Sequence, residues 1–339
     1  MAYHRDPAVL MGQAQDLQHA AMRVLSFICL AALLAAQEPS PDVPTLEPRL
    51  SALKTPLNPI LHRQVELAIQ TRDYLKAEQI LVREIDRNPR SAQLLTLAAS
   101  VFFLDAKYLN TAIALKKAEK IAPLDDQSRF TLAMAYVVMK HWDWAWPELE
   151  NLSRKNPANP VYLYWLGRLD YDAHRFEDAL AKFKKVVAAA PAFMKAYDNL
   201  GLCYEALGEM DDAIESYERA VELNRTAAAP SPWPPLNLGT LLLKLDRRDE
   251  AKTALAESLR IDSKFARAHY QLGVLLEQYG RNTDAIRELE QAAAIDETYA
   301  QPHYALGRIY QKMGNAAKAE SEYSSFERLK HETPENRAR

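Results

Sequence analysis

Apolar and small residues recur along this chain with the spacing of amphipathic helices, and the whole pattern repeats every 34 residues. The stretch from Pro160 to Phe193 reads PVYLYWLGRLDYDAHRFEDALAKFKKVVAAAPAF, and the next unit keeps the same order of residue types. In both units an apolar residue and a glycine stand on the first helix, a small residue opens the second, and an aromatic residue follows four positions later. These residues are Leu166, Gly167, Ala179 and Phe183 in one unit, and Leu200, Gly201, Ala213 and Tyr217 in the next. The pattern predicts two helices per unit and no strands.

Glycine and proline mark the limits of these helices. Gly167, Gly201, Gly239, Gly273 and Gly307 are spaced by 34, 38, 34 and 34 residues, and Gly208, Gly280 and Gly314 each follow one of them by seven. The second set should end the first helices, because glycine adopts a left-handed backbone at little cost. Pro123, Pro157 and Pro191 should end second helices, because proline cannot continue the hydrogen-bond ladder. A fixed period of about 20 to 50 residues indicates a solenoid or a repeat array.

The repeated residues resemble the tetratricopeptide repeat, in its secreted or periplasmic bacterial type. The resemblance implies an all-α fold, a right-handed α-solenoid (superhelix) of about eight helix-turn-helix repeats. The expected units are 58–91, 92–125, 126–159, 160–193, 194–227, 232–265, 266–299 and 300–333, with a four-residue insertion at 228–231. Small residues should face each other where the two helices of a pair cross, as Gly167 faces Ala179, Gly201 faces Ala213 and Ala133 faces Ala145.

The N-terminal region has the layout of a secretory signal peptide. Arg23 precedes the near-apolar run Val24–Ala36, which is followed by small and polar residues, so we expect a start at Met22 and cleavage of residues 1–36. The run is too short for a comfortable membrane anchor, which needs about 20 residues. Residues 37–57 then form a proline-rich linker, and 334–339 a charged tail. This predicts a periplasmic or secreted protein without a membrane span; the alternatives are an uncleaved segment that tethers it to the membrane, or an extra amphipathic helix.

The composition of the chain and its lack of known motifs argue against several classes of function. A net charge of −3 and the lack of a basic stripe argue against nucleic-acid binding. The chain has no phosphate-binding loop, nucleophile elbow or zinc motif, so we expect no catalytic residues, no metal and no cofactor. His269 and His303 occupy the same position in successive units, which favours a packing role over metal binding.

In the tetratricopeptide family the first helix of each unit lines a concave groove, which implies that the groove is the binding site here. The candidate peptide-binding residues are Tyr164, Arg168, Tyr171, Asn199, Asn237, Arg267, Tyr270, Gln271, Tyr304, Arg308 and Lys312. Phe130, Met134, Val137, Val138 and Trp165 should make the N-terminal half of the groove apolar. The C-terminal half, which also includes Lys244, should be polar and mildly basic. Alternatively, Trp165 and Tyr171 belong to the core between repeats and the cations form a solvated face.

Two further resemblances bear on the partner. Asn199 and Asn237 are similar to the asparagines by which the repeats of O-linked N-acetylglucosamine transferases hold an extended peptide backbone, a task that suits amide groups. The carboxylate clamp of the Hsp90 and Hsp70 co-chaperones is absent, because His62 and Glu66 stand where its lysine and asparagine would be.

The sequence therefore predicts a non-catalytic scaffold that binds an extended peptide or a helix in its groove. One alternative is a structural protein that self-associates through its terminal repeats, as a homo-oligomer. Another is the non-catalytic repeat subunit of a glycosyltransferase-like system, which is disfavoured as a full enzyme because only a short tail follows the last unit.

Overall fold

The computed structural model describes residues 57–332, and within this range the chain consists of helices joined by short turns. The helices are α3 (Pro59–Gln70), α4 (Tyr74–Arg87), α5 (Ala92–Leu104), α6 (Tyr108–Glu119), α7 (Asp126–Val138), α8 (Trp142–Lys155), α9 (Pro160–Asp172), α10 (Phe176–Ala189), α11 (Met194–Leu207), α12 (Met210–Arg225), α13 (Trp233–Lys244), α14 (Arg248–Ile261), α15 (Ala266–Gln278), α16 (Asn282–Ile295), α17 (Ala300–Lys312) and α18 (Ala316–Glu332).

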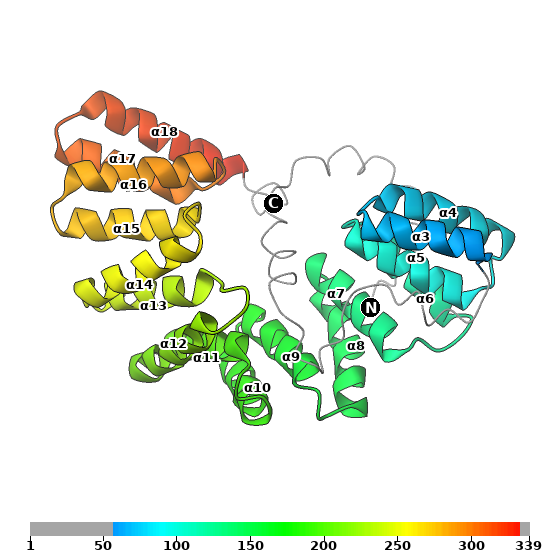
Figure 1. Ribbon diagram of the computed structural model, residues 1–339. Coiled ribbons are helices and arrows are strands. Elements are labelled where there is room, and N and C mark those ends of the chain that lie inside the picture. The colour runs from blue at the N-terminus through cyan, green and yellow to red at the C-terminus, as the bar shows by residue number, and fades with distance from the viewer. Residues whose placement is uncertain (1–56, 333–339) are drawn as a thin grey trace, which may run out of the picture. The chain divides into compact units, whose positions relative to one another are not determined.

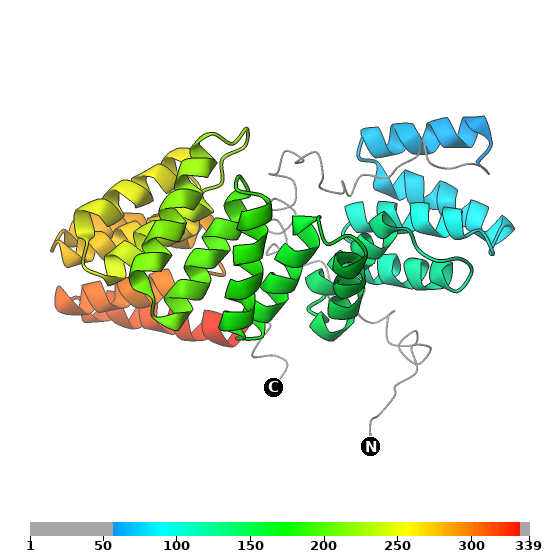
Figure 2. The same ribbon diagram turned by 90° about the horizontal axis from the view of Figure 1, so that it is seen from below.

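These helices form eight pairs, and each helix packs against the helix before it and the helix after it along the chain. Figure 1 and Figure 2 show the pairs stacked in sequence order. The prediction of an all-α repeat solenoid is confirmed, whereas the right-handed twist stays a prediction. The expected signal region 1–36, residues 37–56 of the linker and the tail 334–339 lie outside the described residues.

The two helices of a pair approach most closely where a glycine on the first helix meets a large side chain on the second. A Cβ atom added to Gly201 would lie 2.4 Å from the ring of Tyr217, and one added to Gly167 would lie 2.9 Å from the ring of Phe183. Both rings are completely buried. The atoms nearest to these two glycines thus belong to rings four residues beyond Ala213 and Ala179, whereas at Gly239 and Gly273 the carbonyls of the equivalent Ala251 and Ala285 lie 3.3 Å from the added Cβ atom. The glycines leave room for the rings four residues further on.

Every first helix ends in a left-handed turn at the same register position. Gly208, Gly280 and Gly314 have φ of 82°, 73° and 76°, as their role in ending helices requires. The other five units have non-glycine residues at this position, with φ between 56° and 59°: Arg72, Ala106, Lys140, His174 and Asp246. A left-handed backbone costs such residues roughly 1–2 kcal/mol each. The geometry of the turn is thus kept even where the residue does not favour it.

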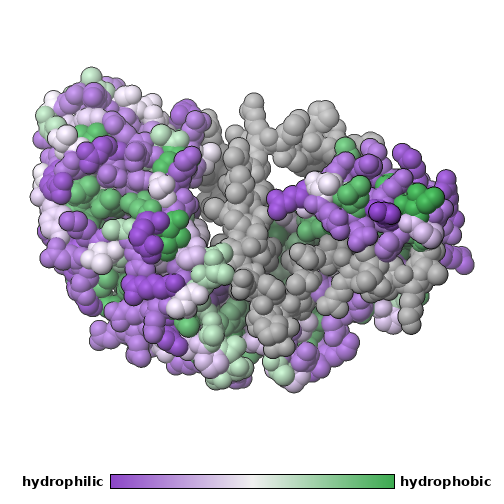
Figure 3. Space-filling model, in the orientation of Figure 1, coloured by the Kyte–Doolittle hydropathy of each residue, from purple (hydrophilic) through white to green (hydrophobic). Residues whose placement is uncertain are grey.

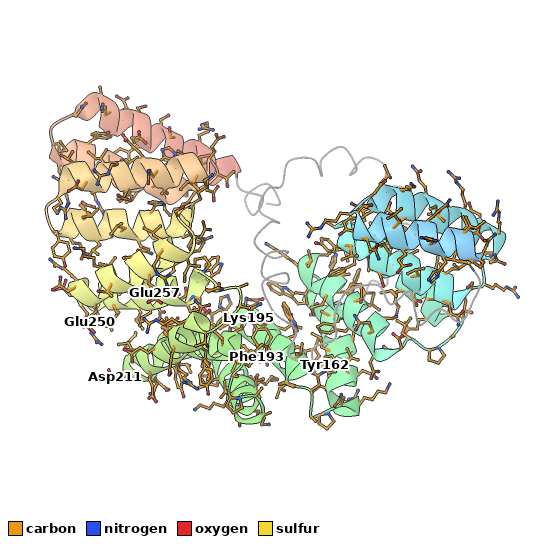
Figure 4. The ribbon with its side chains drawn as sticks, viewed as in Figure 1. Tyr162, Phe193, Lys195, Asp211, Glu250 and Glu257 are labelled. Atoms are coloured by element: carbon orange, nitrogen blue, oxygen red, sulfur yellow. The ribbon has the colours of Figure 1, made fainter. Side chains whose placement is uncertain are left out.

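Two hydrogen bonds from the side chain of Asn224 close the loop formed by the insertion between the fifth and sixth units. The fully buried Asn224 donates from Nδ2 to the carbonyl of Ser231 and accepts at Oδ1 from the amide of Ser231, both at 2.8 Å. Beside it, Arg225 donates to both carboxylate oxygens of Glu257 on α14, at 2.8 and 2.7 Å (Figure 4). The extra residues are thus looped out, and the stack continues through α13.

We predict that Gly201→Ala lowers the free energy of unfolding by about 1–3 kcal/mol, as overpacking does. In an exposed helix the same change would stabilise the protein, because alanine is the better helix former. Adding Tyr217→Leu recreates the pairing of Ala133 with Leu149 in the third unit, where both side chains are fully buried. Tyr217→Leu should therefore cost less beside Gly201→Ala than it costs alone. Urea unfolding of the four proteins measures this coupling, and purely additive costs would contradict the close crossing.

Candidate functional site

The first helices of neighbouring units pack against each other as well as against their own second helices. This holds for α5 with α7, α9 with α11, α11 with α13, α13 with α15 and α15 with α17, while second helices have no comparable contacts within residues 57–332. From α9 to α17 the first helices therefore line one continuous side of the stack. We call this side the first-helix face and define it by the eleven candidate residues. They are Tyr164, Arg168 and Tyr171 on α9, Asn199 on α11, Asn237 on α13, Arg267, Tyr270 and Gln271 on α15, and Tyr304, Arg308 and Lys312 on α17.

At the N-terminal end of this face, the side chains bond to each other. Asn199 accepts at Oδ1 from Arg168 at 2.6 Å, and its Nδ2 donates to the Lys195 carbonyl at 2.7 Å and to the Tyr164 hydroxyl at 3.3 Å. Asn199 is only 3% exposed and Tyr164 is also buried. The expectation of a solvent-facing amide at Asn199 was therefore wrong, because the guanidinium of the preceding unit occupies its oxygen. Arg168 also lies 5.9 Å from the centre of the Tyr171 ring.

Two of the residues expected to form the apolar half of the groove belong to the hydrophobic core instead. Phe130 and Met134 are 3% and 1% exposed, and the ring of Phe130 lies 5.5 Å from that of Tyr162 on α9. These two residues pack between units, so the expectation that they line a groove was wrong. Val137, Val138 and Trp165 are half-buried.

The middle of the face carries a carboxylate with an unusual environment. Asn237 donates to Asp198 at 3.0 Å, and burial raises the pKa of Asp198 to about 6. Burial also lowers the pKa of Lys195 to about 8; this residue lies at the start of α11 close to Phe193 (Figure 4). About two turns further along α11 from Asp198, Glu205 binds Lys244 at 2.5 Å. Asn237 and Lys244 thus both pair with acidic residues of the preceding unit.

The C-terminal part of the face contains a three-residue charge cluster. Glu277, whose side chain is 7% exposed, binds Arg308 at 2.5 Å and Lys312 at 2.7 Å. Burial alone would raise the pKa of Glu277, but the hydrogen bonds from Lys312 and Arg308 outweigh it and hold the pKa below its usual value. The prediction of a mildly basic half-groove therefore needs correction, since the carboxylate cancels one of the two cations. The Nε of Arg308 is buried and has no hydrogen-bond partner among residues 57–332.

Arg267 differs from the other cations of the face. Its side chain is exposed, and its guanidinium carbon lies 5.5 Å from the ring centres of both Trp233 and Tyr299. No carboxylate within residues 57–332 pairs with it. Tyr270 stacks edge-on against Tyr299 at 5.4 Å, and Gln271 beside it forms no hydrogen bond within this range. The rings hold the guanidinium in place while its N–H groups stay open to solvent.

The end of the face is aromatic. Tyr304 is 49% exposed, and its ring lies 5.3 Å from that of Phe326 on α18. Together with Arg267 and Gln271 it forms the part of the face that is accessible and not committed to internal bonds. Sequence reasoning missed the acidic residues Asp198, Glu205 and Glu277, although they stand on the same first helices as the candidates.

Between residues 57 and 332 no cluster of His, Cys, Asp and Glu side chains could hold a metal ion. His269 and His303 instead bind Glu288 at 2.8 Å and Glu322 at 2.7 Å through Nδ1, in the same register of two successive units. Cys203 is buried, which raises its pKa to about 12. None of the helices from Pro59 to Glu332 is both long and apolar enough to cross a bilayer.

Stacked helix pairs with one continuous first-helix face define the class of α-helical repeat solenoids. Within that class, three family models match the chain: one tetratricopeptide repeat model over 130–191 and 164–231, a second over 236–265, and a TPR repeat model over 278–314. The chain belongs to the tetratricopeptide repeat family.

Curated relatives are longer than this chain. The chain is 25% identical over 215 residues to the BBSome complex member BBS4 of Bos taurus, which covers 63% of this chain and 40% of that protein. It is 26% identical over 147 residues to a methionine–tRNA ligase of Chlorobium chlorochromatii, covering 40% of this chain and 19% of the ligase. The chain thus spans less than half the length of either relative.

Solved structures share the fold. A chain of the Cut9–Hcn1 hetero-tetramer of the APC/C superposes with a TM-score of 0.60 at 17% identity, covering 77% of this chain and 50% of that one. A tetratricopeptide repeat protein from Parabacteroides merdae gives 0.59 at 14% identity, with 70% and 92% covered. At these identities the likeness shows the fold alone.

We predict that Asp198 makes stability fall as the pH rises. Its pKa in the folded chain, about 6, exceeds the ordinary value of 3.8, so the folded state binds more protons than the unfolded state between pH 4 and 6. Its contribution is therefore present below pH 4 and lost by pH 6. Asp198→Asn should stabilise the chain at pH 7 by about 3 kcal/mol, and its advantage should fall below about 1 kcal/mol at pH 4. Urea unfolding at both pH values tests this, with Asp211→Asn, an exposed position on α12 (Figure 4), as the control. An equal advantage at both pH values would contradict the raised pKa.

Proposed function

We propose that the chain is a non-catalytic scaffold that holds a protein partner, as an extended peptide or a helix, against its first-helix face. The observation that carries the proposal is the uncommitted patch of Arg267, Gln271 and Tyr304. These side chains come from two successive units at nearby register positions, and they are exposed or half-buried. Most polar side chains elsewhere on the face form hydrogen bonds or ion pairs with each other, and these bonds stabilise the packing of neighbouring units.

The chemistry of the patch suits a peptide. The amide of Gln271 can donate to a carbonyl and accept from an N–H, so it can bond to a backbone of any sequence. Arg267, pre-positioned between two rings, suits a carboxylate, either an acidic side chain or a chain terminus. Tyr304 offers an exposed ring for an apolar side chain. The favoured partner therefore combines an extended backbone with one carboxylate and one apolar residue.

We expect Arg267 to contribute more to peptide affinity than Gln271. A hydrogen bond to a charged group is worth roughly 1.5–3 kcal/mol and one to a neutral group about 0.5–1.5 kcal/mol. For a peptide selected from a random 12-residue library, Arg267→Ala should weaken binding by about 10- to 100-fold and Gln271→Ala by about 2- to 10-fold. Added salt should reduce only the arginine effect.

Titration calorimetry at two ionic strengths measures these effects. Glu218→Ala, an exposed position on the second helix α12, is the matched control and should leave the affinity unchanged. Selected peptides that bind both first-helix variants as tightly as the parent would move the site away from the first-helix face.

We also propose that the chain is exported to the periplasm or secreted, on the strength of Arg23 and the apolar run Val24–Ala36. The chain recovered from an export-competent host should then begin near Gln37. N-terminal sequencing of the purified protein gives the answer. An intact Met1 or Met22 on protein found in the cytoplasm would overturn export.

A further inference from the structure

The three most exposed large apolar side chains of residues 57–332 all lie on the first helix pair. Ile60 and Leu67 on α3 are 66% and 55% exposed, and Leu75 at the start of α4 is 58% exposed. Val82, about two turns further along the same side of α4, is 42% exposed. Figure 3 shows apolar side chains at the surface over α3 and α4, with hydrophilic side chains among them.

The same pair carries a group of exposed cations that form no ion pair and touch no aromatic ring among residues 57–332. They are Arg63, Arg72, Lys76, Arg83 and Arg90. No other unit of the described stack has as many exposed cations without an ion pair. Apolar and cationic side chains are thus interleaved on the exposed sides of α3 and α4, which we call the α3–α4 surface.

The carboxylates of this pair do not neutralise the cations. Three of its five carboxylates accept hydrogen bonds elsewhere: Asp73 from the backbone amide of Lys76, Glu78 from Lys107 of the second unit, and Glu84 from Arg87. The other two, Glu66 and Asp86, have no partner within the described range. The unpaired cations therefore outnumber the unpaired carboxylates, and the α3–α4 surface attracts anions.

The exposed side of α4 also differs from that of the later second helices. The register position of Leu75 is held by an exposed acid in the third to sixth units: Asp143, Glu177, Asp211 and Asp249. An acid in the first turn stabilises a helix through its dipole, and α4 has none there. Leu75 and Lys76 thus forgo a stabilisation that the later units have, without being covered by another helix. An external ligand with apolar and anionic groups would account for both side chains.

We propose that the α3–α4 surface docks on an anionic lipid surface. The apolar side chains enter the boundary between headgroups and acyl chains, as those of an interfacial amphipathic helix do. The long stems of Lys76 and Arg83 let their charged groups reach the level of the lipid phosphates. The proposal is independent of the peptide site, because Arg267, Gln271 and Tyr304 lie on α15 and α17.

A lipid surface fits these cations better than a protein partner does. Arg267 is held between two rings, as suits recognition of one fixed carboxylate. The cations of the α3–α4 surface have no such contacts between residues 57 and 332, so their charges are not fixed in one place. Such charges suit mobile anionic headgroups. A second copy of the chain fits poorly, because two such surfaces in contact would bring like charges together.

The test is an environment-sensitive fluorophore at the middle of the exposed side of α4. The label is attached to Gln79→Cys in the full chain, with Cys29 replaced by serine; Cys203 is buried and stays unlabelled. The matched control carries the label at Glu215→Cys, the exposed equivalent of Gln79 on α12. Vesicles of equimolar phosphatidylglycerol and phosphatidylcholine should shift the emission to the blue at position 79 and leave it unchanged at position 215.

Vesicle titrations of the label at position 79 then separate charge from apolar contact. Lys76→Gln should weaken binding about 5-fold, the contribution of one cation near an anionic surface. Leu75→Ser should weaken it about 10-fold, because it removes an inserted apolar side chain. Lys185→Gln, an exposed and unpaired cation at the register position of Arg83 on α10, should leave the affinity unchanged. Circular dichroism checks that each variant stays helical.

Three results would overturn the proposal. The first is no blue shift at position 79, or an equal shift at position 215. The second is a loss of affinity in Lys185→Gln as large as that in Lys76→Gln, since binding would then depend on overall charge and not on the α3–α4 surface. The third is a concentration-dependent blue shift at position 79 without vesicles, which would show that a protein surface covers α4.

Discussion

The close crossing of the two helices in each pair is the contact on which the rest of this structure depends. A small residue on the first helix makes room for a large buried side chain on the second, as Gly201 does for Tyr217. Because each pair buries its apolar surface only against neighbouring pairs, this contact sets the spacing of the whole stack. The left-handed turns that recur in all eight units hold each pair in the same geometry.

Uniform spacing brings equivalent positions of successive first helices side by side, and this is how the fold creates a site. Across most of the face, neighbouring units pair their polar groups, as Asn199 does with Arg168 and Glu277 with Lys312. Such pairs stabilise the register of the stack. They leave few polar side chains free to bind a ligand. Near Arg267 and Gln271 the pairing is absent among the described residues, so the patch that is open for binding lies there.

The sequence predicted the architecture well because glycine, alanine and proline report directly on backbone geometry and close approach. It predicted the site less well. Spacing places Asn199 and Arg308 on the first-helix face, but it does not say which neighbours their side chains reach. The buried amide and the role of Glu277 depend on contacts between units 31 to 35 residues apart. Likewise, the left-handed turns at Ala106 and Asp246 carry no glycine to signal them.

The central claim is that partners bind the first-helix face, and site-specific photo-cross-linking tests it most directly. A photoreactive amino acid is placed at Gln271 on α15 in one protein and at Glu218 on α12 in another, and each is irradiated with a peptide selected from a random library. The account predicts cross-linked peptide at Gln271 and none at Glu218. Cross-linking at Glu218 alone would show that partners bind the second helices and would contradict the account.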